Sequence, residues 1–307
     1  MSATRRISQP VRGRGVRKLL WKRLRLPRGV VHPLLSAAKR LANPEQLRLR
    51  REAAAALALE GRDVTEVPEA HGYRVLGPGA LPGVGDVVSR CEAVYRQVRG
   101  DAEVDDHLFN PRKRFLLSLL SGADFCAHPD LLRFMVSRPI LDAASLYMRS
   151  VPLLAGAALW WTPPNETALR SQLFHFDGED ERQLKLLVNI FDTRAEHGPF
   201  TLMPADRSAP LCTSAAMRRR IEDEEVDARC GLENAVSFEG PAGSGGFVDT
   251  SRCLHYGSRH ASQDRLVLMI QFLRFDCPTE STFDFAVPPD LPGLDLDPVQ
   301  KLALGLE

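Results

Sequence analysis

A series of short apolar segments from about residue 154 onward limits most strongly what this chain can fold into. In order they read "LAGAALWW", "LFHFD", "LKLLVNIFD", "PFTLMP", "AVSFEG", "GGFVD" and "RLVLMIQFLRF". Glycine, proline and aspartate separate them, and these residues favour turns. Many short apolar runs between turn signals are typical of a β-sandwich or β-barrel. One charged stretch at 213–228 has helical periodicity and interrupts the series.

The sequence before residue 150 is mostly helical in character. We expect a helix near 45–60, a short strand and turn in "HGYRVLGPGALPG", a helix in "GDVVSRCEAVYRQV", and two or three helices over 112–149. The predicted fold class is therefore mainly β with flanking helices, and a helical N-terminal part precedes the β core. We expect one domain over residues 45–290 and a C-terminal tail at 291–307.

Charge is distributed unevenly, and residues 1–44 are predicted to form a basic, partly disordered arm. Residues 1–50 hold 14 Lys and Arg against one acid, Glu45, whereas the rest of the chain holds 26 basic and 38 acidic side chains. Apolar residues recur at helical spacing among the cations of residues 16–26. Such a helix can lie on an anionic membrane surface, bind an acidic partner or dock on its own domain.

The composition excludes several classes of protein. Hydrophobic residues make up 44% and charged residues 26%, as in ordinary globular proteins, and no apolar run reaches the roughly 18 residues of a membrane span. The six cysteines are scattered without a C-x-x-C pair, which argues against a zinc ribbon or disulfide framework. We expect no secretory signal, no specific nucleic-acid partner and a cytoplasmic location. The Arg-rich start leaves an organellar transit peptide as the alternative.

The segment "FHFDGED" at 174–180 places a histidine and an aspartate two residues apart in an apolar setting. Positions i and i+2 of a strand share one face, so His175 and Asp177 would lie side by side, with Phe174 and Phe176 on the other face. Two metal-binding groups on one face suggest a metal site. Because such a pair also arises by chance, the rest of the chain must decide.

A metal site needs a third ligand, and three later histidines offer one. His255 follows "GGFVDTSRCL", where a glycine turn leads into a short strand, and we choose it. His197 lies in the polar turn "DTRAEHGPF", and His260 lies in the next connection, so both are expected in loops. For any one of these histidines alone, a structural or surface role would be the simpler interpretation.

Ten residues after His255, Arg265 opens the most apolar segment. An arginine there is costly to bury unless a carboxylate meets it, and its planar fork suits bidentate carboxylate binding. Arg274, near the other end, is expected to reach solvent. Two histidines and one carboxylate form a facial triad that leaves open positions on a metal such as Fe(II).

The order His-x-Asp, distal His, then Arg resembles Fe(II)/2-oxoglutarate oxygenases, and more specifically the phytanoyl-CoA dioxygenase family. The resemblance covers roughly residues 70–275. "HGYRVLGPGAL" is similar to the family's first strand and turn. "SQLFHFDGEDERQLKLLVNIFDTRAEHGPFTLMPADRS" and "GGFVDTSRCLHYGSRHASQDRLVLMIQF" are similar to its metal-binding segments. The family's fold is a double-stranded β-helix, a jelly-roll of the cupin type.

This resemblance implies Fe(II), 2-oxoglutarate and O2 as cofactor and co-substrates, with succinate and CO2 released as a substrate is hydroxylated. It implies His175, Asp177 and His255 as iron ligands and Arg265 as the clamp for the C5 carboxylate of 2-oxoglutarate. An aspartate among the ligands favours hydroxylation, because halogenating relatives leave that position empty. Thr201 and Ser258 are further candidate contacts for 2-oxoglutarate.

The sequence departs from the family pattern at the pocket rim. "PADRS", with Asp206 and Arg207, stands where the family has Pro-Gly-Ser-His, and His197 stands where it has Asn. The substrate is therefore open beyond a small organic or lipid-like molecule. Trp160, Trp161, Met203 and Met269 could line an apolar pocket or belong to the core. Two rival functions also stay open: a degenerate barrel that binds a partner, and a cupin-type metalloenzyme that does not use 2-oxoglutarate.

Overall fold

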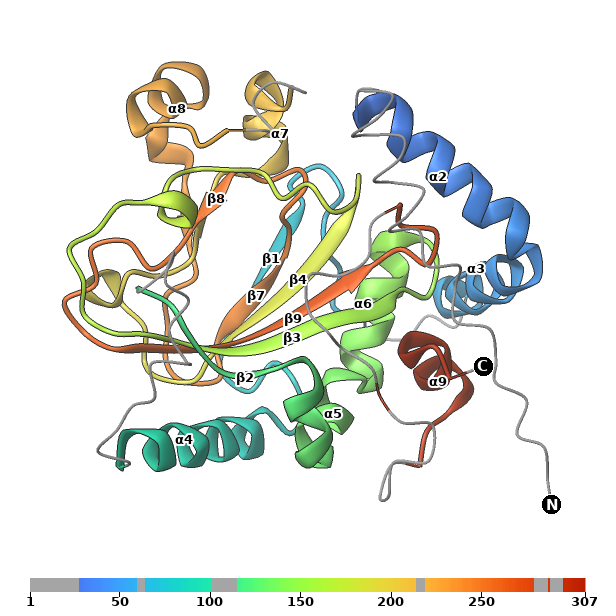
Figure 1. Cartoon of the computed structure of the whole chain (residues 1–307), viewed down its shortest axis with the longest axis horizontal. Helices are drawn as coiled ribbons and strands as arrows, with labels where there is room; N and C mark the ends of the chain where they lie inside the picture. The colour runs from blue at the N-terminus through green and yellow to red at the C-terminus, as the bar shows by residue number, and fades with distance from the viewer. Residues whose placement is uncertain are drawn as a thin grey trace.

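The structure is a computed structural model, and it describes residues 28–59, 64–100, 115–213, 219–278, 287 and 295–306. Two antiparallel sheets form its core, with helices on the outside (Figure 1). The large sheet has six strands in the order β1-β7-β4-β9-β3-β2, and the small sheet has three in the order β6-β5-β8. The strands are β1 (Tyr73–Leu76), β2 (Leu117–Ser121), β3 (Leu153–Thr162), β4 (Gln183–Asn189), β5 (Thr201–Leu202), β6 (Val236–Ser237), β7 (Gly245–Asp249), β8 (His255–Tyr256) and β9 (Arg265–Leu273).

The helices lie before, between and after these strands (Figure 1). They are α2 (Arg28–Ala42), α3 (Pro44–Leu59), α4 (Val84–Gly100), α5 (Pro129–Met135), α6 (Arg138–Met148), α7 (Ala205–Ser208), α8 (Asp223–Cys230) and α9 (Pro298–Leu304). In the described part of the chain, none of them is both long and apolar enough to cross a membrane.

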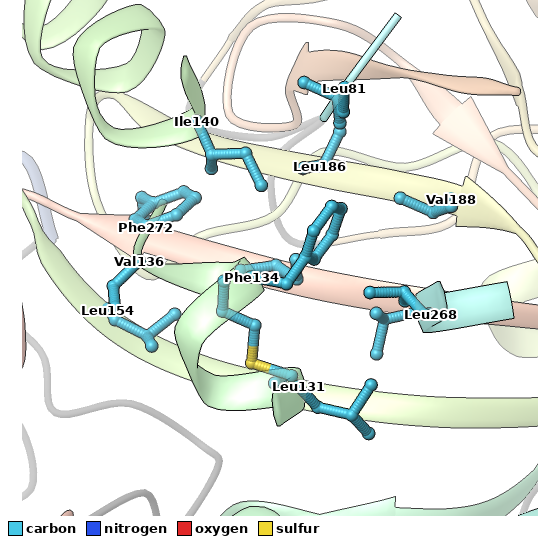
Figure 2. Packing of buried hydrophobic residues seen from close by; sticks show 14 of the residues in the cluster. Leu81, Leu131, Phe134, Val136, Ile140, Leu154, Leu186, Val188, Leu268 and Phe272 are labelled. Atoms are coloured by element: carbon cyan, nitrogen blue, oxygen red, sulfur yellow. The ribbon is translucent and has the colours of Figure 1, made fainter. Parts of the chain in front are cut away.

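Strand β9 shows how the two layers form, because its alternate side chains enter two different hydrophobic clusters. Leu266, Leu268, Ile270 and Phe272 join the cluster that α4, α5, α6 and α9 cover. Val267 and Met269 face the other way and pack with Leu202 of β5. A strand buried on both faces reads as a continuous apolar run, which is what the sequence has here. Figure 2 shows the helix side of the sheet, where Phe134 lies near Leu186 of β4 and Leu268 of β9.

The predictions of local structure are mostly confirmed, with two errors. The strand segments after residue 153 other than "LFHFD", the helix at 44–59, the strand at 73–76 and the helix at 84–100 are present. The segment "LFHFD" forms only isolated bridges. Residues 117–121, which we expected to be helical, form strand β2 and pair with β3. This edge pairing outweighs the helix preference of a leucine-rich segment. The last part of the charged stretch at 213–228 lies in helix α8 (Asp223–Cys230), whereas residues 214–218 of that stretch lie outside the described residues.

The two ends of the described chain pack on the body. In α2 the Arg40 guanidinium lies 2.5 Å from the Asp276 carboxylate. In α3 the buried Arg50 side chain donates hydrogen bonds to the carbonyl oxygens of Val151 (3.0 Å) and Leu302 (2.7 Å). Leu302 belongs to α9, so part of the segment expected to be a tail is a packed helix. The amphipathic stretch at 16–26 lies outside the described residues.

Gly245 offers a test of the sheet, because its backbone in β7 packs tightly against β4. A Cβ atom at this position would overlap the Leu187 carbonyl oxygen, and φ is +154°. We expect Gly245→Ala to lower the free energy of unfolding by about 1–3 kcal/mol or more, as overpacking does. A Cβ at Gly77 would meet nothing within 4 Å, so Gly77→Ala is the matched control. Equal urea midpoints for the two variants would show that this contact does not constrain the sheet.

Candidate metal centre

His175 and His255 lie directly opposite each other on neighbouring segments. Their backbones form an antiparallel bridge in which each amide donates to the other's carbonyl oxygen at 3.1 Å. Side chains of directly opposed residues project from the same face, and the two ring centroids are 4.3 Å apart. The segment around His175 forms isolated bridges and not the continuous strand that we expected. Phe174 and Phe176 are buried in a separate apolar cluster, as the alternation predicted.

Asp177 completes the cluster. Its backbone is held by Thr250, because the Asp177 amide donates a hydrogen bond to the Thr250 carbonyl oxygen at 2.9 Å. Asp177 Oδ1 lies 3.8 Å from His175 Nε2, and Oδ2 lies 3.6 Å from His255 Nε2. One ligand atom from each of the three residues lies within 4.8 Å of the others. The structure thus brings the three predicted ligands together at separations that one metal ion could span.

Both imidazoles are oriented for metal binding. His175 Nδ1 lies 2.9 Å from the Leu173 carbonyl oxygen, and His255 Nδ1 lies 3.0 Å from that of Cys253. A carbonyl oxygen can only accept, so each Nδ1 carries the proton and each Nε2 presents a lone pair towards Asp177. Burial lowers the pKa of both histidines, which favours the neutral form that metals bind.

Lys185 is a member of this site that the sequence reasoning missed. It lies in β4 between Leu184 and Leu186, which face the helices, so its own side chain faces the space between the sheets. Its Nζ is 2.6 Å from Asp177 Oδ2, and the two side chains are 14% and 16% exposed. Burial opposes the charged forms of both groups, but the attraction between the two charges is stronger. The pKa of Lys185 is therefore raised, and that of Asp177 lies below its usual range. The signal in the sequence was a lysine inside an apolar strand.

Replacing Lys185 with methionine tests the role of this pair. Without metal, Lys185→Met leaves the Asp177 carboxylate without its cation, and we expect a loss of about 1–3 kcal/mol in unfolding free energy. A bound divalent ion would supply the missing charge, so Co(II) should raise the melting temperature more in the variant than in the wild type. The control is Lys301→Met, because Lys301 is exposed on α9. An equal Co(II) response in all three proteins would contradict this role.

Arg265 lies at the start of β9, opposite Thr162 of β3, and is only 4% exposed. Its Nη2 donates to Ser258 Oγ at 2.9 Å, and Ser258 Oγ lies 2.9 Å from Thr162 Oγ1. Its Nε has no hydrogen-bond partner, and none of the described carboxylates forms an ion pair with it. Burial lowers the pKa of Arg265 to about 10, so it remains a cation at neutral pH. A buried guanidinium with an unused donor is suited to bind an external carboxylate.

Of the two further candidate contacts for 2-oxoglutarate, Ser258 and Thr201, only Ser258 bonds Arg265. Ser258 has φ +66°, a left-handed conformation that is uncommon for serine, and its hydroxyl contacts Arg265. The Thr201 hydroxyl instead hydrogen-bonds with the Ser237 hydroxyl at 2.8 Å. Phe200 connects the metal and arginine ends, because it stacks on His255 at 5.3 Å and lies beside Gly257, next to the guanidinium.

The remaining residues singled out in the sequence lie elsewhere. His197 Nδ1 accepts a hydrogen bond from the Arg194 amide, and His260 is exposed. Arg274 does not extend to solvent as expected, because its Nε bonds the buried Asp180 carboxylate at 3.0–3.1 Å. Of the four candidates for an apolar lining, Trp160 and Met269 belong to the cluster between the sheets, whereas Trp161 and Met203 belong to other clusters.

Comparisons with known proteins show the fold. No protein-family model and no curated protein sequence matches the chain. EctD from S. alaskensis in its apo form is similar at 17% identity and a TM-score of 0.50, over 78% of this chain and 84% of that one. EctD with 2-oxoglutarate and 5-hydroxyectoine is similar at 15% identity and a TM-score of 0.48, over 78% of this chain and 84% of that one. The non-heme alpha-ketoglutarate-dependent epimerase SnoN is similar at 17% identity and a TM-score of 0.45, over 80% of this chain and 92% of that one. The predicted jelly-roll core with flanking helices is confirmed by the first of these.

Proposed function

We propose that this protein is a non-haem Fe(II)- and 2-oxoglutarate-dependent oxygenase, related to the phytanoyl-CoA dioxygenase family, that hydroxylates a small organic molecule. The observation that carries this proposal is the pairing of two features in one interior: a His-Asp-His cluster and a buried arginine with an unused donor. EctD, whose fold this chain shares, has been crystallised with Fe and with 2-oxoglutarate. A site enclosed between two sheets suits a small-molecule substrate.

Each residue has a defined task in this proposal. His175, Asp177 and His255 would hold the iron, and Arg265 would bind the far carboxylate of 2-oxoglutarate with its orientation fixed by Ser258. The iron and 2-oxoglutarate together supply the oxidising chemistry that activates O2 and releases succinate and CO2. Phe200 and the apolar residues between the sheets exclude water from the reacting groups.

The test is whether the full-length protein converts 2-oxoglutarate to succinate in an iron-dependent way. Even without its substrate, we expect slow succinate release with Fe(II) and ascorbate under air, which EDTA and His175→Ala both abolish. A partner-binding barrel or a cupin-type enzyme that does not use 2-oxoglutarate would give no succinate while still binding metal. That outcome would overturn the proposal.

A further inference from the structure

Arg220 lies in line with the two histidines of the metal centre. The next residue, Ile221, forms an antiparallel bridge with Phe174, and its amide donates to the Phe174 carbonyl oxygen at 2.9 Å. In an antiparallel pair, the residue before Ile221 is opposite the residue after Phe174. Extended by one residue, this register sets Arg220 opposite His175, which forms its own bridge with His255. Directly opposed side chains project from the same face, so the Arg220 guanidinium lies on the face that carries the metal ligands.

The charge of Arg220 acts on this site. Burial is the main cause that lowers the pKa of both His175 and His255, and the positive charge of Arg220 adds a smaller effect in the same direction. Arg220 is exposed. Desolvation by the surrounding residues lowers its pKa, while the charges of Asp177 and Glu179 raise it. A second arginine, Arg170, is near enough to lower it further.

Arg220 differs from its neighbours in that none of the described carboxylates binds it. Arg219 bonds both carboxylate oxygens of Glu225 on the outer surface. Arg259 bonds Asp223 at 2.6 Å and lies over the Tyr256 ring. For Arg220, the described residues provide neither an ion pair nor a hydrogen bond.

The charges near Arg220 are mostly positive once the Asp177 carboxylate is bound to a metal ion. Arg220, Arg170 and Lys185 are cations, and Glu179 is the one anion among the groups that act on Arg220 apart from Asp177. A site with this excess favours an anion over a neutral molecule of the same shape. The planar guanidinium suits a carboxylate best, because it can bind both oxygens at once.

We propose that the substrate of this site is an organic acid whose carboxylate Arg220 binds at the rim of the metal centre, an inference that rests on the proposed function. Arg265 takes the co-substrate deeper in the site, and Arg220 takes the substrate and so directs which carbon lies over the metal.

The experiment compares wild type with Arg220→Gln and Arg219→Gln, which remove the same charge from adjacent residues on opposite faces. Each full-length protein is loaded with Co(II), which replaces iron and prevents turnover, and with 2-oxoglutarate. Benzoate, phenylacetate, hexanoate and decanoate, each paired with its primary amide, are the probes, and binding is measured by thermal shift. We expect wild type and Arg219→Gln to bind at least one acid about 10-fold more tightly than its amide, and Arg220→Gln to lose this preference.

Three results would overturn the proposal: no acid preferred over its amide by the wild type, an unchanged preference in Arg220→Gln, or weaker 2-oxoglutarate binding in that variant. The last would assign Arg220 to the co-substrate. Titration of 2-oxoglutarate in the same samples separates this inference from the proposed function. If the wild type binds 2-oxoglutarate but shows no acid preference, only the substrate assignment fails. If it does not bind 2-oxoglutarate, the proposed function fails as well.

Discussion

Replacing His255 with alanine should lower the affinity for Fe(II) by at least about 100-fold, the upper end of what residues that merely support a ligand cost when changed. The variant loses one of three converging donor atoms, and the nearby His260 is exposed in a loop and cannot replace it. Succinate release should fall to background. Competition of the protein with a chelator of known affinity for Fe(II) gives the measurement.

The control for this variant is His260→Asn, since asparagine adopts the left-handed conformation of His260 (φ +48°) more readily than alanine does. It should bind iron as the wild type does. His255 also stacks on Phe200, so a circular dichroism spectrum should establish that His255→Ala remains folded. A folded His255→Ala protein with wild-type iron affinity would show that the metal lies elsewhere.

Replacing Arg265 with methionine should weaken 2-oxoglutarate binding by about 100-fold, because a bidentate charge-assisted pair with a carboxylate is lost. Iron binding should be unchanged, since Arg265 touches none of the three ligands. Without co-substrate, the variant should be at least as stable as the wild type, because it removes a buried cation that none of the described carboxylates pairs with. Calorimetric titration and thermal unfolding measure the two effects.

Two further variants serve as comparisons for Arg265→Met. Arg265→Lys keeps the charge but loses the planar fork, so its 2-oxoglutarate affinity should be intermediate. Arg274→Met should show the opposite pattern, with normal co-substrate binding and lower stability, because it leaves the fully buried Asp180 carboxylate unpaired. Normal 2-oxoglutarate binding by Arg265→Met would mean that another residue holds the co-substrate.

The sequence could predict the β core because apolar runs and turn residues are local features. Strand β9 is continuous in its apolar character, and "GGFVD" coincides with β7. Strand β2 could not be found in this way, because "LSLLS" is extended only through its pairing with β3. The His-x-Asp segment was expected to be one strand, yet it makes single bridges to two different segments.

The candidate site was predictable where residue type alone carries the chemistry. His175, Asp177, His255 and Arg265 are groups that are costly to bury in apolar segments, so their presence there required a reason. Lys185 satisfies the same criterion in "QLKLLVN", but only the register of β4 shows that Asp177 is its partner. Arg220 is one of three consecutive arginines, and only the bridge that the next residue, Ile221, forms with Phe174 singles it out.

A titration of 2-oxoglutarate into the Fe(II)-loaded protein without oxygen tests most directly the claim that iron and 2-oxoglutarate bind at one site. We expect a saturable visible absorption band from metal-to-ligand charge transfer, because the co-substrate would bind the iron. The band should be absent in His255→Ala, and in Arg265→Met it should require a far higher concentration of 2-oxoglutarate. Iron-loaded wild-type protein that shows no such band at any concentration of 2-oxoglutarate would contradict the claim.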